Sequence, residues 1–414
     1  MISDSPKFTQ RCTFLALFFL TVCFFVSPIS VSLTTVTYLL AALLVLLSGD
    51  WRARWERLKV NKAGLSFWLL GAVFIIGVFY TTATKSLVVH DLQKRHWLFI
   101  TPLFIAMLTD DRWRQRMINA FLGAMVITLI LSPLKFFFHI NLVSWAHIKI
   151  HQDAGDVFTD HIVQSLAMNI AAFICAYRFL FEKKFRMVYA ILFILMGINI
   201  LFISHGRTGY GTFFLLLCYL GLIRFGWKGM FSAGIISVLM ISVVFFISPG
   251  FQSRVKAIYN HAENYNQMHH ATSVGIRIEM LSIAKKMISE RPWFGYGTGG
   301  IETALPSVVP AKDRVFNPSV DFVESVYLNF LLEFGLFGFV VLLIALALQI
   351  KATFQLPHNY RCLMQAMLIC IFFGGIFNAF FVSFSPAHFY SIFAALCFSA
   401  QSNPLSRYPG RGLG

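Results

Sequence analysis

The sequence predicts an all-α polytopic membrane protein, and three observations support this fold class. The chain has 414 residues, of which 57% are hydrophobic and 13% charged, and its mean hydropathy is +0.71. A water-soluble core could not bury so much apolar surface. Apolar runs long enough to cross about 30 Å of hydrocarbon recur along the chain. Basic residues concentrate in alternate connections between these runs.

About twelve apolar runs are predicted to span the membrane, of which the fourth and the last are short for this purpose. In chain order the runs cover 12–30, 33–48, 64–82, 97–108, 117–139, 161–181, 187–204, 209–225, 229–248, 323–350, 362–384 and 388–401. The first run is expected to be a retained helix, because it lacks a small-residue cleavage site and further spans follow it.

The positions of Lys and Arg predict the orientation. With a cytoplasmic N-terminus, the inside connections hold the basic clusters 52–62, 112–116 and 178–186, whereas the short outside connections hold few basic residues. Both termini are therefore predicted to be cytoplasmic. The net charge of +16 is explained in the same way, because basic residues mark cytoplasmic loops and the anionic lipids that they face. It does not indicate a nucleic-acid partner.

The predicted spans divide the chain into four parts. Residues 1–248 hold spans one to nine, and residues 249–321 form a large outside loop before the tenth span. Residues 322–401 hold the remaining spans, and residues 402–414 form a cytoplasmic tail. Loops as long as 249–321 are translocated largely regardless of their charge.

The large loop contains a predicted helix. Thr272 or Ser273 can cap it, Pro292 ends it, and Arg277 lies on its polar side. Its apolar positions recur near helical spacing at Ile276, Leu281, Ala284, Met287 and Ile288.

A glycine turn follows this helix, with Gly295, Gly297, Gly299 and Gly300. Backbone amides in such a turn can approach an anion closely. A plain flexible connection is the alternative, and the glycine pattern alone leaves both open.

Three motifs occur in order across residues 200–345. The first is SHGRTGY, which places Arg207 just after the outer end of a span. The second is Arg277 followed by PWFGYGTGG, and the third is Glu324-Ser-Val-Tyr-Leu with Gly-Leu-Phe-Gly downstream. Through these motifs the sequence resembles the O-antigen ligases and the related O-antigen polymerases, and the predicted topology extends the resemblance over the whole chain.

The resemblance implies a glycosyltransferase with a GT-C-like helical fold in the bacterial inner membrane. Such enzymes of lipopolysaccharide biosynthesis transfer a completed glycan from undecaprenyl diphosphate to lipid A-core at the periplasmic face, without a metal, nucleotide sugar or other cofactor. The leaving diphosphate gains negative charge, which guanidinium groups can stabilise bidentately. Arg207 and Arg277 are expected to do so. The alternative for each is a pair with a nearby carboxylate or with lipid headgroups.

Glu324 stands where the resemblance implies a catalytic histidine, in the family motif His-Asn-x-Tyr-Leu. A histidine there accepts a proton from the acceptor hydroxyl or orients it. Three interpretations stay open. Glu324 can be the general base, it can pair with Arg207 or Arg277 while the base lies elsewhere, or the protein can be an inactive relative.

Five further residues are expected to bind substrate: His205, Gly297, Gly299, Arg314 and Tyr327. His205 lies at the same helix mouth as Arg207 and can orient a phosphate. Arg314 can face phosphorylated core sugars, or it can reach lipid headgroups as interfacial arginines do. Tyr327 can bond a sugar or be an ordinary interfacial aromatic residue. Asn378, in an apolar run, is expected to make a helix–helix contact.

No metal site is expected. His147 and His151 lie four residues apart, with Asp153 and Asp156 nearby, and could hold a metal on one helical face. The metal site is the less favoured interpretation. The seven cysteines lie in or beside apolar runs without a CxxC pair, which predicts buried thiols.

The sequence therefore predicts an O-antigen ligase-like enzyme. An O-antigen polymerase is the nearest alternative because it uses the same donor at the same face, and a protein O-glycosyltransferase is a third. A lipid or solute transporter is less favoured, since the spans show neither paired broken helices in corresponding halves nor a run of acidic residues.

Overall fold

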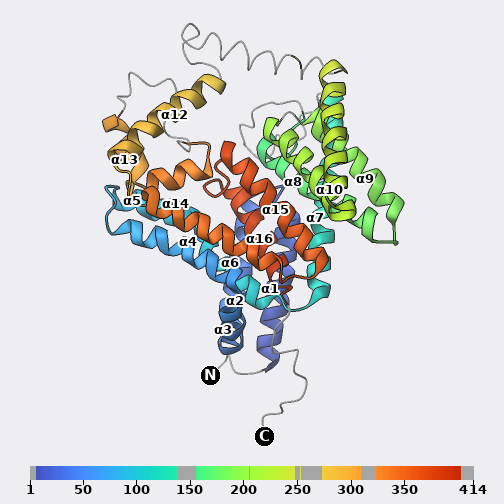
Figure 1. The fold of residues 1–414 in the computed structure, drawn as a ribbon. Coiled ribbons are helices and arrows are strands. Elements are labelled where there is room, and N and C mark those ends of the chain that lie inside the picture. The colour runs from blue at the N-terminus through green and yellow to red at the C-terminus, as the bar shows by residue number, and fades with distance from the viewer. Residues whose placement is uncertain are drawn as a thin grey trace.

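The computed structural model describes residues 6–138, 155–204, 206–247, 252, 273–308 and 323–401. Within these ranges the regular secondary structure is helical, as the sequence predicts (Figure 1). The helices are α1 (Pro6–Val26), α2 (Val31–Leu47), α3 (Trp51–Val60), α4 (Lys62–Val78), α5 (Lys85–Lys94), α6 (Trp97–Met107), α7 (Asp111–Phe138), α8 (His161–Phe181), α9 (Arg186–Ile198), the π-helical turn η2 (Asn199–Ile203), α10 (Arg207–Ile247), α12 (Ser273–Glu290), α13 (Gly300–Val308), α14 (Val326–Thr353), α15 (His358–Phe377) and α16 (Phe384–Phe398).

Each predicted apolar run coincides with one of these helices or with half of one, but the count of twelve spans is not confirmed. Among the described residues, 7 helices are long and apolar enough to cross a membrane, or up to 8 if the bent pair of α2 and α3 is one span. The apolar helices α4 and α16 are shorter. The chain is thus a polytopic membrane protein, and the side that each end faces stays a prediction.

Part of this difference lies in α10, which consists of two antiparallel halves. Gly226 interrupts the helix with φ +66° and ψ −155°. Eight residues of continuous helix would span about 12 Å, yet a Cβ atom placed on Gly221 would lie only 2.3 Å from the carbonyl oxygen of Gly229. The chain therefore reverses at Gly226, and the two halves match the eighth and ninth predicted runs.

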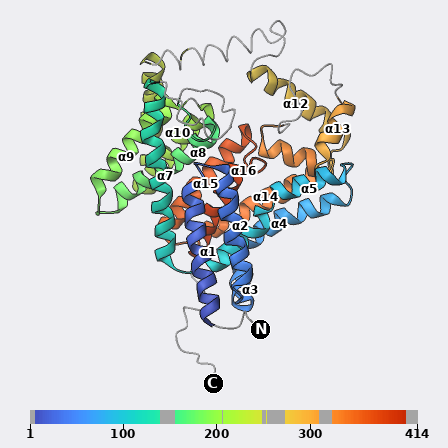
Figure 2. The ribbon, with the colours of Figure 1, turned by 180° about the vertical axis from the view of Figure 1, so that it is seen from behind.

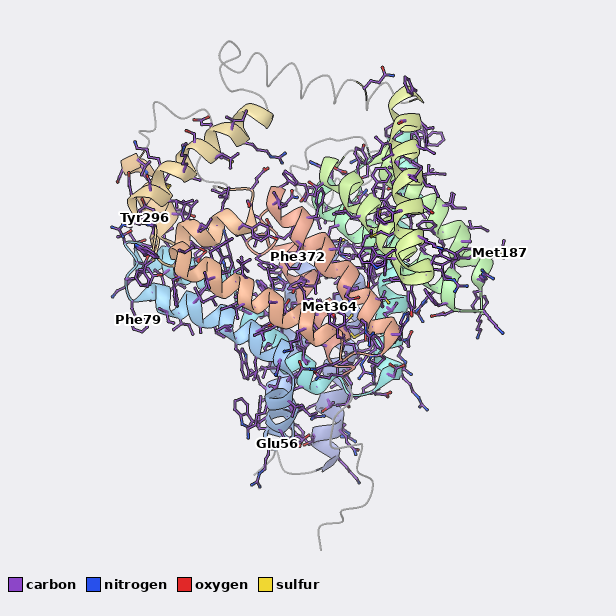
Figure 3. All side chains as sticks on the ribbon, in the orientation of Figure 1. Glu56, Phe79, Met187, Tyr296, Met364 and Phe372 are labelled. Carbon is purple, nitrogen blue, oxygen red and sulfur yellow. The ribbon has the colours of Figure 1, made fainter. Side chains whose placement is uncertain are left out.

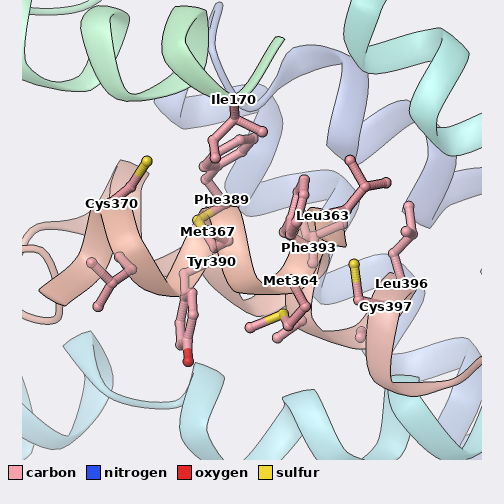
Figure 4. Close-up of a cluster of buried hydrophobic side chains, with 14 of the residues drawn as sticks. Ile170, Leu363, Met364, Met367, Cys370, Phe389, Tyr390, Phe393, Leu396 and Cys397 are labelled. Carbon is pink, nitrogen blue, oxygen red and sulfur yellow. The ribbon is translucent and has the colours of Figure 1, made fainter. Parts of the chain in front are cut away.

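The centre of the bundle is α16. It contacts α1, α2, α6, α7, α8 and α15, with α1 and α2 side by side (Figure 2). Every residue from Pro386 to Phe398 is buried, and Phe389, Tyr390 and Phe393 pack among the methionines of α15 (Figure 4). Because protein rather than lipid surrounds α16, its 15 residues need not reach the length of a lipid-exposed span.

The large loop folds back onto the bundle through α12 and α13. The bounds of α12 confirm the predicted loop helix, and its buried face consists of Met280, Ile283, Ala284 and Met287. With Tyr296, labelled in Figure 3, this face forms a small core against α13 and the first half of α14. The prediction that Leu281 belongs to the face is wrong. It is 54% exposed, because the buried positions repeat as i, i+3, i+4 and i+7 from Met280.

The glycine turn after α12 docks into a break in α14. Gly335 interrupts that helix with φ +60° and ψ −158°, which leaves main-chain groups open on both sides of the break. Four backbone hydrogen bonds of 2.7 to 3.1 Å fill them: Tyr296 N–H to Leu332 C=O, Gly297 N–H to Glu333 C=O, Leu336 N–H to Pro292 C=O and Phe337 N–H to Trp293 C=O. The loop is therefore joined to the bundle through its main chain.

Glycine is required on both sides of this contact. Gly295 and Gly335 both have positive φ. A Cβ atom on Gly335 would lie 2.4 Å from the carbonyl carbon of Trp293, and one on Gly295 would lie 2.4 Å from the carbonyl oxygen of Leu332. Neither obstacle is a side chain that could move away.

We expect Gly335→Ala to destabilise the protein by about 2–4 kcal/mol, because it adds backbone strain to a main-chain clash. The measurement is the midpoint of thermal unfolding in detergent. The matched control is Gly123→Ala in α7, where a Cβ atom meets nothing closer than 3.9 Å and the midpoint should hold or rise slightly. Equal midpoints for the two variants would contradict the docking described above.

Candidate functional site

Arg277, at the start of the second turn of α12, forms an ion pair with Glu324, the residue that precedes the cap of α14. Nε and Nη2 of Arg277 donate to Oε2 of Glu324 at 3.0 and 2.6 Å. The two side chains are 36% and 45% exposed, so ligands can reach the pair. Of the three interpretations of Glu324, pairing with Arg277 is the one seen in this structure. A catalytic role for either residue remains a prediction.

The backbone on both sides of Glu324 is held by hydrogen bonds. Ser325 is the N-cap of α14, and its hydroxyl donates to the carbonyl of Gly375 in α15 at 3.3 Å. Asn329 donates from Nδ2 to the carbonyls of Val323 and Ser325 at 2.7 and 2.8 Å. The carboxylate of Glu324 therefore leaves the chain at a defined point beside a helix N-terminus.

Arg207 begins α10, and two asparagines hold the turn that it starts. Asn378, just after α15, donates from Nδ2 to Oγ1 of Thr208 at 3.2 Å, which confirms its predicted helix–helix contact. Asn169 of α8 donates to the carbonyl of Gly209 at 3.1 Å. Both asparagines are buried, and no hydrogen-bond partner reaches either Oδ1 within the described part of the chain.

The last turn of α15 brings the starts of α10 and α14 to the same end of the bundle. A Cβ atom on Gly374 would lie 3.5 Å from the side chain of Thr208, and one on Gly375 would lie 3.4 Å from that of Val326. The last turn of α15 thus lies between the backbone of Arg207 on one side and the Arg277–Glu324 pair on the other. The three residues predicted to be catalytic are gathered at one end of the molecule.

Several predicted residues cannot be placed. His205 and Arg314 lie outside the described residues, as do His147, His151 and Asp153 and the side chain of Arg207. In the ranges that the structure describes, no group of three metal-ligating side chains occurs.

The prediction that Gly297 and Gly299 bind an anion through their amides is not supported. The amide of Gly297 donates to the backbone of Glu333, and that of Gly299 donates to Oε1 of the same residue at 3.3 Å. A Cβ atom on Gly297 would lie 2.6 Å from the carbonyl oxygen of Gly77 in α4. Gly297 lets the turn approach α4 closely and Gly299 lets it approach α5, and the amides of both are used inside the protein.

A buried ionic cluster under the turn is absent from the sequence predictions. Arg95 and Glu333 are each 3% exposed. Arg95 pairs with Asp91 one helical turn earlier, and its Nη2 lies 3.6 Å from Oε2 of Glu333. The sequence does contain a signal for this cluster, because Glu333 lies within an apolar run. An ionisable residue there is costly in a membrane unless it has a partner.

The side chain of Tyr327 makes a contact inside the bundle, and its predicted role in sugar binding stays a prediction. Its hydroxyl donates to the carbonyl of Phe372 in α15 at 3.0 Å, and the side chain is half-buried. The hydroxyl proton of Tyr327 is therefore donated across a helix–helix contact in this structure.

Comparison with known families agrees with the motifs. Residues 191–343 match the family model described as O-antigen ligase, whereas no curated protein matches the chain. The matched segment covers a little over a third of the sequence, from α9 into the second half of α14. It includes Arg207, Arg277 and Glu324 together with the glycine turn. The resemblance inferred from the motifs is confirmed over residues 191–343, which are similar to the O-antigen ligase family, a family of ligases and polymerases of lipid-linked glycans.

Proposed function

We propose that the chain is an O-antigen ligase, which transfers a polysaccharide from undecaprenyl diphosphate to lipid A-core. The family domain supports a lipid-linked glycan as the donor. The observation that carries the proposal is the Arg277–Glu324 pair, an exposed guanidinium beside an exposed carboxylate where the loop meets the bundle. The first suits a diphosphate leaving group, and the second suits an acceptor hydroxyl. In this proposal the site faces the periplasm, the side to which the basic residues assign the large loop.

The ion pair is the resting arrangement in this mechanism. A diphosphate carries more negative charge than one carboxylate, and a guanidinium binds its oxygens bidentately. The donor therefore displaces Glu324 from Arg277. Donor binding then has two effects, since it neutralises the leaving group and releases the carboxylate.

The freed carboxylate of Glu324 accepts the proton of the acceptor hydroxyl. The hydroxyl oxygen forms a new bond to the anomeric carbon of the donor sugar, and the bond from that carbon to the diphosphate oxygen breaks. The electron pair of the broken bond goes to the diphosphate, whose charge Arg277 and Arg207 stabilise.

An O-antigen polymerase is the second candidate, because the matched family includes both activities. The deciding experiment uses the purified protein with an undecaprenyl-diphosphate-linked glycan, with and without lipid A-core. Glycan attached to the core supports the ligase. A longer undecaprenyl-linked glycan, formed without core, supports the polymerase, and an unchanged donor supports an inactive relative.

We expect Arg277→Ala to lower kcat/KM for transfer by about 10²–10³, the usual effect of losing one group that stabilises transition-state charge. Arg277→Lys should recover only part of the activity, because an ammonium cannot bind two oxygens in one plane. Both are checked in the transfer assay. Because the pair is solvent-exposed, the loss of stability should stay below about 1 kcal/mol.

Lys285→Ala is the matched control for Arg277, since it removes an exposed cation from the same helix. Its transfer rate should equal that of the wild type. If Arg277→Ala were equally active, the role of Arg277 at the leaving group would have to be abandoned.

We expect Glu324→Gln to lower kcat by about 10²–10⁴, because the amide cannot accept the proton. Glu324→His should restore part of the rate. An imidazole titrates near pH ~6.5 and accepts a proton only when neutral, so transfer by this variant should rise as the pH increases through about 6.5. The measurement is the pH–rate profile of both variants. Near wild-type transfer by Glu324→Gln would show that the base lies elsewhere.

A further inference from the structure

The short helix α3 leaves α2 at an angle of 111°. Gly49 and Asp50, with φ +70° and +59°, make the bend. The sequence of α3, WRARWERLKV, holds four basic residues and one acidic residue. A helix that re-entered the membrane would place these charges in hydrocarbon, which is costly. A helix lying along the membrane surface keeps them in water.

Arg54 holds α3 in this orientation. It is 3% exposed, and it donates from Nη1 to the carbonyl of Val45 and from Nη2 to the hydroxyl of Ser48, both at 2.6 Å. Val45 and Ser48 lie at the end of α2, where the last carbonyls lack helical partners and a cation is favoured. One arginine of α3 therefore points inward and fixes the bend, and the other basic residues remain outside.

The outer face of α3 combines exposed indoles with exposed cations. Trp51 and Trp55, one turn apart, are 44% and 47% exposed. Trp55 stacks on Trp68 of α4 with ring centroids 5.9 Å apart, and Nζ of Lys59 lies 5.8 Å from the Trp55 ring. Arg52 is exposed beside them. Tryptophan and cations together are typical of the level at which lipid headgroups lie.

A cavity of about 410 Å³ lies beside α3, on the side of the helix away from the two indoles. Arg57 lines it, together with residues that include Asn61, Thr109, Arg114 and Gln401. The guanidinium of Arg114 donates to three backbone carbonyls, at 3.0 to 3.2 Å, and is therefore occupied. Arg57 makes a longer ion pair with Asp50, 3.5 Å, and its side chain is 31% exposed. Its guanidinium can exchange that carboxylate for another anion.

We propose that α3 and this cavity bind the headgroup of an anionic phospholipid. The phosphate meets Arg57, Arg52 and Lys59 add attraction from the surface of the leaflet, and the indoles of Trp51 and Trp55 lie among the headgroups. By the distribution of basic residues, this leaflet is the cytoplasmic one. In Figure 3, Glu56 of α3 lies at the bottom of the molecule and Tyr296 of the loop lies well above it at the left edge. The lipid site uses no residue of the proposed transfer reaction.

The test uses the full chain in phosphatidylcholine vesicles that contain a minor fraction of phosphatidylglycerol. Bromine is placed on the acyl chains of one lipid at a time, and quenching of tryptophan fluorescence is measured. We expect brominated phosphatidylglycerol to quench about twofold more than its mole fraction in the vesicle predicts, and this difference is the excess quenching. The excess should fall at high salt. Trp51→Phe with Trp55→Phe should remove most of it, which assigns the signal to α3.

The decisive variant changes Arg52, Arg57 and Lys59 to Gln together, which should abolish the excess quenching. Lys183→Gln, in the exposed connection between α8 and α9, is the matched control and should retain it. Arg52→Gln alone, at an exposed position of α3, should lower the excess quenching and is the variant to measure if the triple variant does not fold. Equal quenching by the two lipids in the wild type, or an unchanged excess in a folded triple variant, would overturn the proposal.

Discussion

Four backbone hydrogen bonds join residues 292–297 to residues 332–337 and hold the large loop on the bundle. A helix that breaks within a membrane is tolerated only where protein covers the open backbone groups, and here the loop supplies that cover. The break at Gly335 and the glycine turn therefore depend on each other. Glu333 adds a second connection, because its side chain meets both the amide of Gly299 and the guanidinium of Arg95. The position of α12, and with it that of Arg277, follows from this contact.

The candidate site combines two motifs that are distant in the sequence. Arg277 comes from the loop, whereas Glu324 stands at the start of a span whose cap is bonded to the last turn of α15. The same turn of α15 holds the start of α10, where Arg207 lies. A guanidinium and a carboxylate that pair in the absence of substrate can each serve a different substrate once the donor separates them. For the proposed ligase chemistry, the diphosphate of the donor must bind Arg277 more strongly than the carboxylate of Glu324 binds it.

Most helix positions could be predicted from the sequence, because hydrocarbon thickness imposes a length on each apolar run. The number of spans could not, since α16 is short but enclosed by protein and α10 reverses within one assigned helix. The contact of Glu324 with Arg277 depends on how the loop folds, so the sequence alone could not show it, and whether Glu324 is the base stays a prediction. The internal hydrogen bonds of Gly297 and Gly299 could not be predicted, because a glycine turn that can approach an anion can equally approach a neighbouring backbone. The contact of Glu333 with Arg95 depends on tertiary structure that no local pattern encodes.

The attachment of α12 at both ends has a consequence for how the loop moves. At its C-terminal end are four main-chain hydrogen bonds, and at its N-terminal end is one exposed ion pair, which contributes less than about 1 kcal/mol. Among the described contacts of α12, this ion pair is thus the weakest, and the packed residues Ile283, Ala284 and Met287 lie between it and the glycine turn. Since the donor is proposed to break this same ion pair, arrival of the diphosphate would free the start of α12 while its packed face stays in place, so the carboxylate of Glu324 would become available to the acceptor only after the donor is bound.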